Sequence, residues 1–151
     1  MRTLCLVAAT LALLSLPAAA QEPRSAILNP AVGACLKQYG DLNAECLMDA
    51  REKSDEDVER VYKNKLSELT VFDNSTWWMA SKAQQSAMIS AFKESQGLWL
   101  TYRDSYCRAA TTPVAETKSL GAALAGCVIN MNQQREQEIL RVKADLTFED
   151  Y

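Results

Sequence analysis

The sequence contains no histidine among its 151 residues. Histidine is the commonest general base in enzymes and the commonest metal ligand, so its absence removes the usual centre of both kinds of site. Neither a glycine-rich phosphate loop nor a serine nucleophile elbow is present. We therefore predict no catalytic residue, no metal site, no cofactor and no enzymatic activity.

Carboxylates alone can catalyse glycoside hydrolysis, so a two-carboxylate hydrolase stays open as an alternative. Residues 51–60 contain eight charged side chains in ten, including Asp55 and Glu59 four positions apart. A run of mixed charges is typical of a solvated helix face. We therefore expect this carboxylate pair to lie in solvent rather than in an active site.

Long apolar runs are lacking after residue 20. The longest, residues 120–129, has ten residues, whereas a helix that crosses a bilayer needs about twenty. We therefore predict no membrane span in that part of the chain.

The first twenty residues have the pattern of a secretory signal peptide. Arg2 supplies the positive start, residues 4–16 are almost entirely apolar, and residues 18–20 are small alanines suited to cleavage. We predict a signal peptide at residues 1–20 and a single exported domain at residues 21–151, located in the periplasm or secreted.

Basic residues are in the minority. The chain has 16 Lys and Arg against 19 Asp and Glu, and loss of Arg2 with the signal peptide takes the net charge from −3 to −4. Nucleic acids and anionic membrane surfaces select basic faces, so we predict that the protein binds neither. A negative net charge suits a basic partner protein instead.

Export leaves four cysteines, because the fifth lies within the signal peptide. An even number in an oxidising compartment indicates two disulfides, for which three connectivities are possible. Cys35 and Cys46 lie at similar distances on either side of Gly40, the expected turn between two helices, so we predict that they pair. Cys107 and Cys127 then most simply connect two long helices.

A short helix is predicted near the start of the exported domain. Residues 21–28 have the composition of a loose leader, and Asn29 followed by Pro30 is typical of a helix cap and first turn. A helix over residues 31–39 would end at Gly40, the usual residue for a left-handed cap. Asp41 is then expected to cap the following helix.

Three long helices are predicted from the spacing of apolar residues. The first covers residues 42–69 and the second residues 82–106, followed by a connector at residues 108–112. The third starts at Thr112-Pro113 or at Thr117 and runs to about residue 146. The side chains expected to face the core are Val58, Tyr62, Leu66, Leu69, Met88, Phe92, Trp99, Tyr106, Leu120, Leu124, Val128, Met131 and Leu140.

No stretch alternates as a strand would, and no segment repeats. The sequence therefore predicts an all-α fold. It is a small bundle of about three long helices plus a short N-terminal helix, stapled by two disulfides.

Residues 70–80 interrupt the helical pattern and contain the adjacent pair Trp77 and Trp78. Two neighbouring indoles on one element cannot easily both point inward, so one of them is a candidate for a binding surface. The alternative is that both cover the end of the bundle.

The densest aromatic stretch of the chain is residues 96–107. In a helix, Gln96, Trp99, Arg103 and Cys107 fall three and four positions apart and share one face. This spacing is more typical of a core than of a ligand site. An indole one turn before an arginine can also stack on the guanidinium group.

This stretch resembles a family of small secreted bacterial proteins, formerly a domain of unknown function, grouped with the N-terminal domain of a mycobacterial lysozyme-inhibiting lipoprotein. The family pattern has a Gln, a Trp, an aromatic-Arg-Asp triplet and a Cys, then a later Cys followed by an Arg and an apolar residue. The matching residues here are Gln96, Trp99, Tyr102, Arg103, Asp104, Cys107, Cys127, Arg135 and Leu140. Upstream, Val58 and Glu59 stand where the family has Leu and Asn.

The resemblance covers about residues 35–140 and implies an exported binding protein, with a basic lysozyme as its possible partner. The alternative is a structural or accessory envelope protein that binds another envelope protein. The motif itself looks architectural. If Cys107 and Cys127 join antiparallel helices, we expect Asp104 to pair with Arg103 or Arg135 beneath the end of the bundle.

Overall fold

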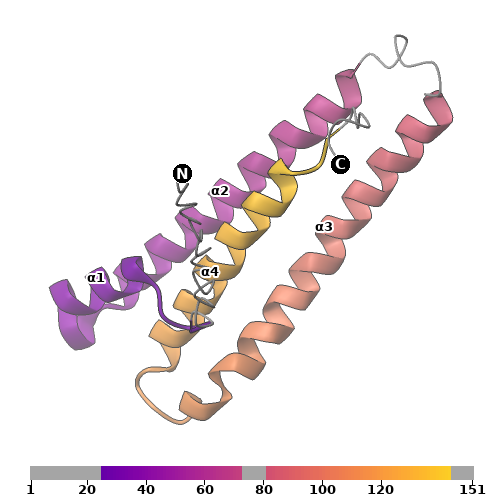
Figure 1. Cartoon of the computed structure of the whole chain (residues 1–151). Coiled ribbons are helices and arrows are strands. Elements are labelled where there is room, and N and C mark those ends of the chain that lie inside the picture. The colour runs from indigo at the N-terminus through magenta and orange to yellow at the C-terminus, as the bar shows by residue number, and fades with distance from the viewer. Residues whose placement is uncertain (1–24, 73–80, 144–151) are drawn as a thin grey trace, which may run out of the picture.

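The computed structural model describes residues 25–72 and 81–143. Figure 1 shows three long helices side by side, α2 (Ala44–Val71), α3 (Lys82–Thr111) and α4 (Leu120–Leu140). α3 runs antiparallel to the other two, and α4 packs most extensively against α2. The short helix α1 (Pro30–Tyr39) packs against both α2 and α4. The predicted all-α bundle is confirmed.

α1 begins and ends as its flanking residues predict. The side chain of Asn29 accepts a hydrogen bond from the backbone N–H of Ala31 at 2.9 Å, and Pro30 occupies the first turn. Gly40 ends the helix with φ at +56°, a conformation that favours glycine. The chain then makes a single 3-10 turn, η1 (Gly40–Leu42), before α2.

The expectation that Asp41 caps α2 was wrong. Asp41 lies inside η1, and α2 begins after Asn43 without a side-chain cap. The carboxylate of Asp41 instead accepts hydrogen bonds from Lys118 Nζ at 3.0 and 3.1 Å. This ion pair connects η1 to the segment that precedes α4.

α3 is longer than predicted. It starts with a capping box, in which the Ser81 hydroxyl accepts from the Gln84 N–H and the Gln84 side chain accepts from the Ser81 N–H. It ends at Thr111, five residues beyond Tyr106, so most of the predicted connector is helical. The Thr111 hydroxyl donates to the carbonyl of Cys107 at 2.8 Å, which satisfies a carbonyl in the last turn.

α4 is shorter than predicted at both ends. Thr112 and Pro113 form a 3-10 turn, η3 (Thr112–Val114), and the helix begins only at Leu120, beyond both predicted starts. It ends at Leu140 rather than near residue 146. Its buried face passes through Ile139, which is 1% exposed, whereas the predicted core residue Leu140 is 55% exposed.

The central core lies where the three long helices meet. Tyr62 from α2 stacks on Phe92 from α3, with ring centroids 5.2 Å apart. Tyr106, which we expected in the core, is 38% exposed near the end of α3. The buried members of this cluster are Val58, Leu69, Phe92, Trp99 and Ile139.

The structure contains both disulfides that the spacing predicts. Cys35–Cys46 joins α1 to α2, and Cys107–Cys127 joins α3 to α4. Cys107 and Cys127 are 1% and 0% exposed and pack with Val128 in a core cluster of their own. The second bridge is therefore part of the interior of the bundle.

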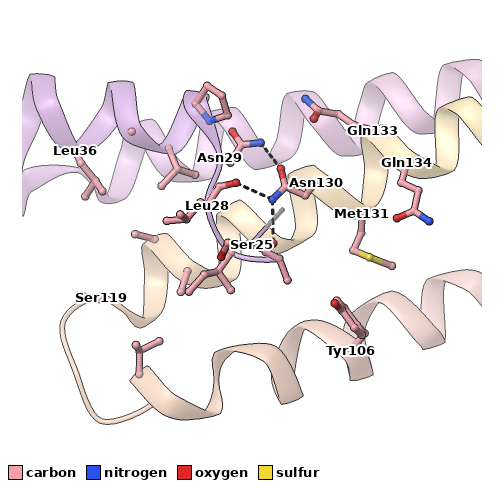
Figure 2. Close-up of a pocket in the computed structure, with 18 residues that line it drawn as sticks. Ser25, Leu28, Asn29, Leu36, Tyr106, Ser119, Asn130, Met131, Gln133 and Gln134 are labelled. Atoms are coloured by element: carbon pink, nitrogen blue, oxygen red, sulfur yellow. Dashed lines mark hydrogen bonds between the residues drawn. The ribbon is translucent and has the colours of Figure 1, made fainter. Parts of the chain in front are cut away.

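Residues 25–29 form an ordered segment that crosses α4, so the predicted loose leader was wrong for the part that the structure describes. The Asn130 Nδ2 donates to the carbonyl oxygens of Ala26 and Leu28, both at 2.9 Å. The Asn29 Nδ2 donates in turn to Asn130 Oδ1 at 2.8 Å, as Figure 2 shows. One amide side chain thus holds the whole segment on the helix.

Gly126, one turn before Asn130, makes this crossing possible. A Cβ atom built on Gly126 would lie 2.1 Å from the carbonyl oxygen of Ile27. That distance is far below a van der Waals contact, and the obstructing atom belongs to the backbone. Only glycine at this position allows the two chains to approach so closely.

We expect Gly126→Ala to lower the free energy of unfolding by about 1–3 kcal/mol, because the backbone near Ile27 must move to relieve the overlap. Urea denaturation measures the loss, and faster amide exchange at residues 25–28 locates it. Gly97→Ala is the matched control. Gly97 is exposed within α3 and has open space around it, so alanine there should stabilise by about 0.5–1 kcal/mol. Equal effects of the two substitutions would contradict this account.

Candidate functional site

Arg103 lies at the centre of a polar cluster that connects all three long helices. Its side chain is 8% exposed. Its Nη1 donates to Asp55 Oδ1 on α2 at 2.7 Å and to Asn132 Oδ1 on α4 at 2.9 Å. Its Nε donates to Asp104 Oδ1 on α3 at 3.1 Å. A single guanidinium group therefore joins helices that are distant in sequence.

Asn132 completes this cluster from α4. The residue is 0% exposed, and its Nδ2 donates to Ser54 Oγ at 3.0 Å and to Asp55 Oδ1 at 2.8 Å. Every buried side-chain nitrogen and oxygen in the described residues has a hydrogen-bond partner. The cluster is thus internally satisfied, as a buried polar network must be to contribute to stability.

Arg135 forms a second cluster one helical turn along α4. Its Nε donates to Gln96 Oε1 at 3.0 Å, and its Nη2 donates to Ser95 Oγ at 2.9 Å. Its Nη1 donates to Glu138 Oε2 at 3.2 Å. These contacts connect α4 to the middle of α3.

Trp99 lies between the two clusters. The guanidinium carbon of Arg103 is 5.3 Å from the centre of the indole, and that of Arg135 is 5.7 Å away. The expected contact with Arg103 is present, and a second cation–π contact accompanies it. Because Trp99 is 8% exposed, both cations approach it in a largely dry environment, where such contacts are strongest.

The predicted pairing of Asp104 with Arg103 or Arg135 is confirmed for Arg103. Asp104 contacts Arg103, whereas Arg135 binds Gln96 and Glu138 instead. The side chain of Asp104 is 58% exposed, so it lies at the surface rather than beneath the end of the bundle. The carboxylate that reaches the buried face of Arg103 comes from Asp55 on α2.

The expectation that Asp55 and Glu59 lie in solvent holds for Glu59 and only in part for Asp55, whose side chain is 39% exposed. Asp55 contacts buried Arg103 and Asn132, whereas Glu59 pairs with Lys63 at 2.7 Å in solvent. One signal in the sequence could have indicated this cluster. Asn132 lies four positions after the predicted core residue Val128, so a polar side chain falls on the core face of α4.

The residues of the sequence motif therefore divide into two groups. Gln96, Trp99, Arg103 and Arg135 converge in the bundle interior, where Arg135 donates to Gln96 and both guanidinium groups lie near the Trp99 ring. Tyr102 is 56% exposed and contacts Tyr106 instead. Because every buried side-chain polar atom of the described residues has a hydrogen-bond partner, we interpret this cluster as structural. The other predicted binding residues, Trp77 and Trp78, lie outside the described residues.

The exposed side of α2 carries a row of acidic side chains. Glu45, Asp49, Glu52 and Glu56 follow one another at intervals of four, three and four, which places them on one helix face. All four are exposed, and none forms an ion pair within the described residues. We call this set the acidic face.

The pKa values of Asp57 and Glu136 are shifted in opposite directions. Hydrogen bonds from Arg60 and then Lys53 lower the pKa of Asp57 below its ordinary value. Burial raises the pKa of Glu136 on α4, and the charge of Asp57 adds to the rise. Ionised Glu136 thus opposes folding, so its contribution to stability becomes less favourable as the pH rises through its titration range.

Within residues 25–72 and 81–143, no three acidic or cysteine side chains are grouped so that they could hold a metal ion. In the same residues, no helix combines the length and the apolar character needed to cross a membrane.

The sequence matches a known protein family. A family model described as lysozyme inhibitor LprI matches residues 35–139. The match includes all four cysteines of the two disulfides and both arginine clusters. No curated protein and no solved structure matches the chain.

Proposed function

The chain belongs to the lysozyme inhibitor LprI family, and on that premise we propose that it is an exported, non-enzymatic protein that binds and inhibits a basic lysozyme in the cell envelope. Family membership supports the class of partner. The acidic face is the observation that supports an electrostatic mode of binding, because its row of exposed carboxylates can attract a basic enzyme.

The acidic face is built for electrostatic attraction. From Glu45 to Glu56 the helix rises about 16 Å, at 1.5 Å per residue. No basic side chain of residues 25–72 or 81–143 pairs with the four carboxylates, so we expect their field to extend into solvent. Such a field accelerates the encounter with an oppositely charged protein and fixes its orientation.

Exposed apolar side chains accompany the carboxylates. Met48 is 68% exposed and lies one turn from both Glu45 and Glu52, and Leu42 before the helix is 87% exposed. Protein interfaces combine a few apolar anchors with a polar rim. This end of α2 has that composition.

Trp77 and Trp78 are proposed as a second contact region. They belong to the segment that follows α2, and an indole suits a cleft that accepts sugar rings. Alanine at either position is proposed to weaken inhibition without changing the fold.

Export is proposed from the signal peptide at residues 1–20, which leaves one domain at residues 21–151 in the periplasm or secreted. The two disulfides support an oxidising compartment, because such bonds are rare in the cytoplasm.

A structural or accessory protein that binds another envelope protein is the second candidate. One observation favours it: the family motif builds the interior, so that motif can be retained without an inhibitory surface. Binding to lysozyme distinguishes the two functions directly.

The double substitution Glu52→Gln/Glu56→Gln is expected to weaken the Kd for a basic lysozyme about tenfold, equivalent to 1.4 kcal/mol. Glu94→Gln/Glu116→Gln changes the net charge equally but alters exposed residues of α3 and of the α3–α4 connection. Calorimetric titration at low and high salt should show the loss only for the first pair, and a smaller difference in high salt. Equal losses for both pairs would contradict the acidic face as the binding surface.

A further inference from the structure

A groove of about 1130 Å³ lies on a part of the molecule that does not include the acidic face. Residues 25–29 and α1 form one wall, and α4 and the end of α3 form the other. Its volume slightly exceeds the usual range of small-molecule sites, about 300–1,000 Å³. The groove is therefore large enough for a ligand of several rings.

Among the residues that the structure describes, those lining this groove carry no charge. Its surface is mainly apolar, with contributions from Ile27, Val32, Ala123 and Met131. A ligand with a net charge would lose hydration there without gaining a counter-ion. The lining therefore selects a neutral ligand.

Side-chain amides provide the polar groups. The side chains of Asn29 and Asn130 hydrogen-bond to each other, and Asn130 also donates to backbone carbonyls of residues 25–29, so neither amide is available to a ligand. Gln134 donates through Nε2 to Glu138, which leaves its Oε1 as an acceptor, and Gln133 makes no hydrogen bond within the described residues. Donors and acceptors are thus available along one edge of the groove.

An aromatic surface faces these amides. In Figure 2, Tyr106 on α3 points toward α4, where Met131 and Gln134 project toward it. The ring of Tyr102, one turn earlier, is 5.8 Å from that of Tyr106 and continues the aromatic surface beyond the groove. Both residues are exposed, Tyr102 at 56% and Tyr106 at 38%, so aromatic surface remains accessible to a ligand.

We propose that this groove binds a short neutral oligosaccharide. A pyranose ring has faces of C–H groups and a rim of hydroxyls, which match an exposed tyrosine ring and a row of side-chain amides. A neutral extended peptide fits less well, because it needs main-chain partners: the backbone of α1, α3 and α4 is hydrogen-bonded within the helices, and in residues 25–29 Asn130 already occupies the carbonyls of Ala26 and Leu28. The site is formed by residues other than the acidic face and does not depend on binding to lysozyme.

The probe that tests this site is the neutral β-1,4-linked tetramer of N-acetylglucosamine, titrated into the oxidised protein and followed by amide chemical shifts. We expect saturation with a Kd of about 1 mM or tighter, with shifts confined to residues 25–33, the end of α3 and α4. Tyr106→Ala should weaken binding at least about tenfold. Tyr39→Ala removes a similarly exposed tyrosine that does not line the groove, so it should leave the Kd unchanged.

Gln134→Ala should weaken the same titration, since it removes an acceptor at the edge of the groove. The de-acetylated, cationic tetramer should bind less tightly than the neutral one. Absence of binding by the neutral tetramer, or equal binding by Tyr106→Ala, would overturn the proposal. So would preferential binding of a capped neutral peptide at the same residues.

Discussion

Replacement of Arg103 by alanine is expected to lower the free energy of unfolding by about 3 kcal/mol. The substitution leaves Asn132 Oδ1 without its donor in a fully buried position and removes the contact with Asp55. It also removes one of the two cations that pack on Trp99. Asn132 and Trp99 are buried, so water cannot readily replace the missing group beside them, whereas Asp55 is partly exposed.

Urea denaturation of oxidised protein measures this effect, with Arg108→Ala as the matched control. Arg108 lies on the same helix, is exposed, and contacts only the Ser105 hydroxyl through its side chain, so its removal should cost less than about 0.5 kcal/mol. Arg103→Lys should recover little, because an ammonium group cannot reproduce the geometry of the guanidinium fork. A loss for Arg103→Ala no larger than that for Arg108→Ala would contradict the structural role of the cluster.

The double substitution Cys107→Ala/Cys127→Ala is expected to cost about 3–4 kcal/mol. Opening the loop of 20 residues accounts for about 3 kcal/mol of chain entropy in the unfolded state. Loss of two buried sulfur atoms adds to this, because both cysteines pack with Val128 and neighbouring side chains.

Removal of Cys35–Cys46 supplies the comparison. It joins α1 to the start of α2 at the edge of the molecule, so Cys35→Ala/Cys46→Ala should cost less and chiefly raise amide exchange in α1. Non-reducing urea denaturation of both variants gives the order. A greater loss for the peripheral bridge would contradict the view that Cys107–Cys127 is a core element.

Local signals in the sequence predicted the beginning and end of α1. Asn29, Pro30 and Gly40 act through their own backbone or side-chain geometry, which needs no knowledge of distant residues. The pair Cys35–Cys46 followed from their similar distances to Gly40, and Cys107–Cys127 from the simplest connection of two long helices. The all-α fold was predictable because apolar residues recur at helical spacing and no stretch alternates as a strand would.

Interactions between distant segments were not predictable in the same way. Asp41 is a residue type that commonly caps helices, but its carboxylate accepts a hydrogen bond from Lys118, 77 positions away, instead of capping α2. Asp55 lies in a run of charges typical of solvent, yet the packing of α2 on α3 places it against Arg103. In both cases a tertiary ion pair decided the role of an acidic residue.

The segment at residues 25–29 shows the same limit. Nothing in its composition indicates order, because the groups that hold it are Gly126 and Asn130, a hundred residues later. These two residues are four apart on α4, so one provides space and the other provides hydrogen bonds to the crossing chain. The groove exists because this segment forms one of its walls.

The interior and the surface of the bundle have separate roles. The motif residues hold the helices together in the interior, whereas the proposed contacts with a partner come from exposed carboxylates on α2. Substitutions in the two sets should therefore affect different quantities, stability for Arg103 and affinity for Glu52 and Glu56.

Lysis of a peptidoglycan suspension by a basic lysozyme, with and without the oxidised protein lacking residues 1–20, tests the central claim most directly. We expect inhibition at about stoichiometric ratios, and we expect this inhibition to weaken as salt is added. Undiminished lysis in the presence of a large excess of the protein would contradict it.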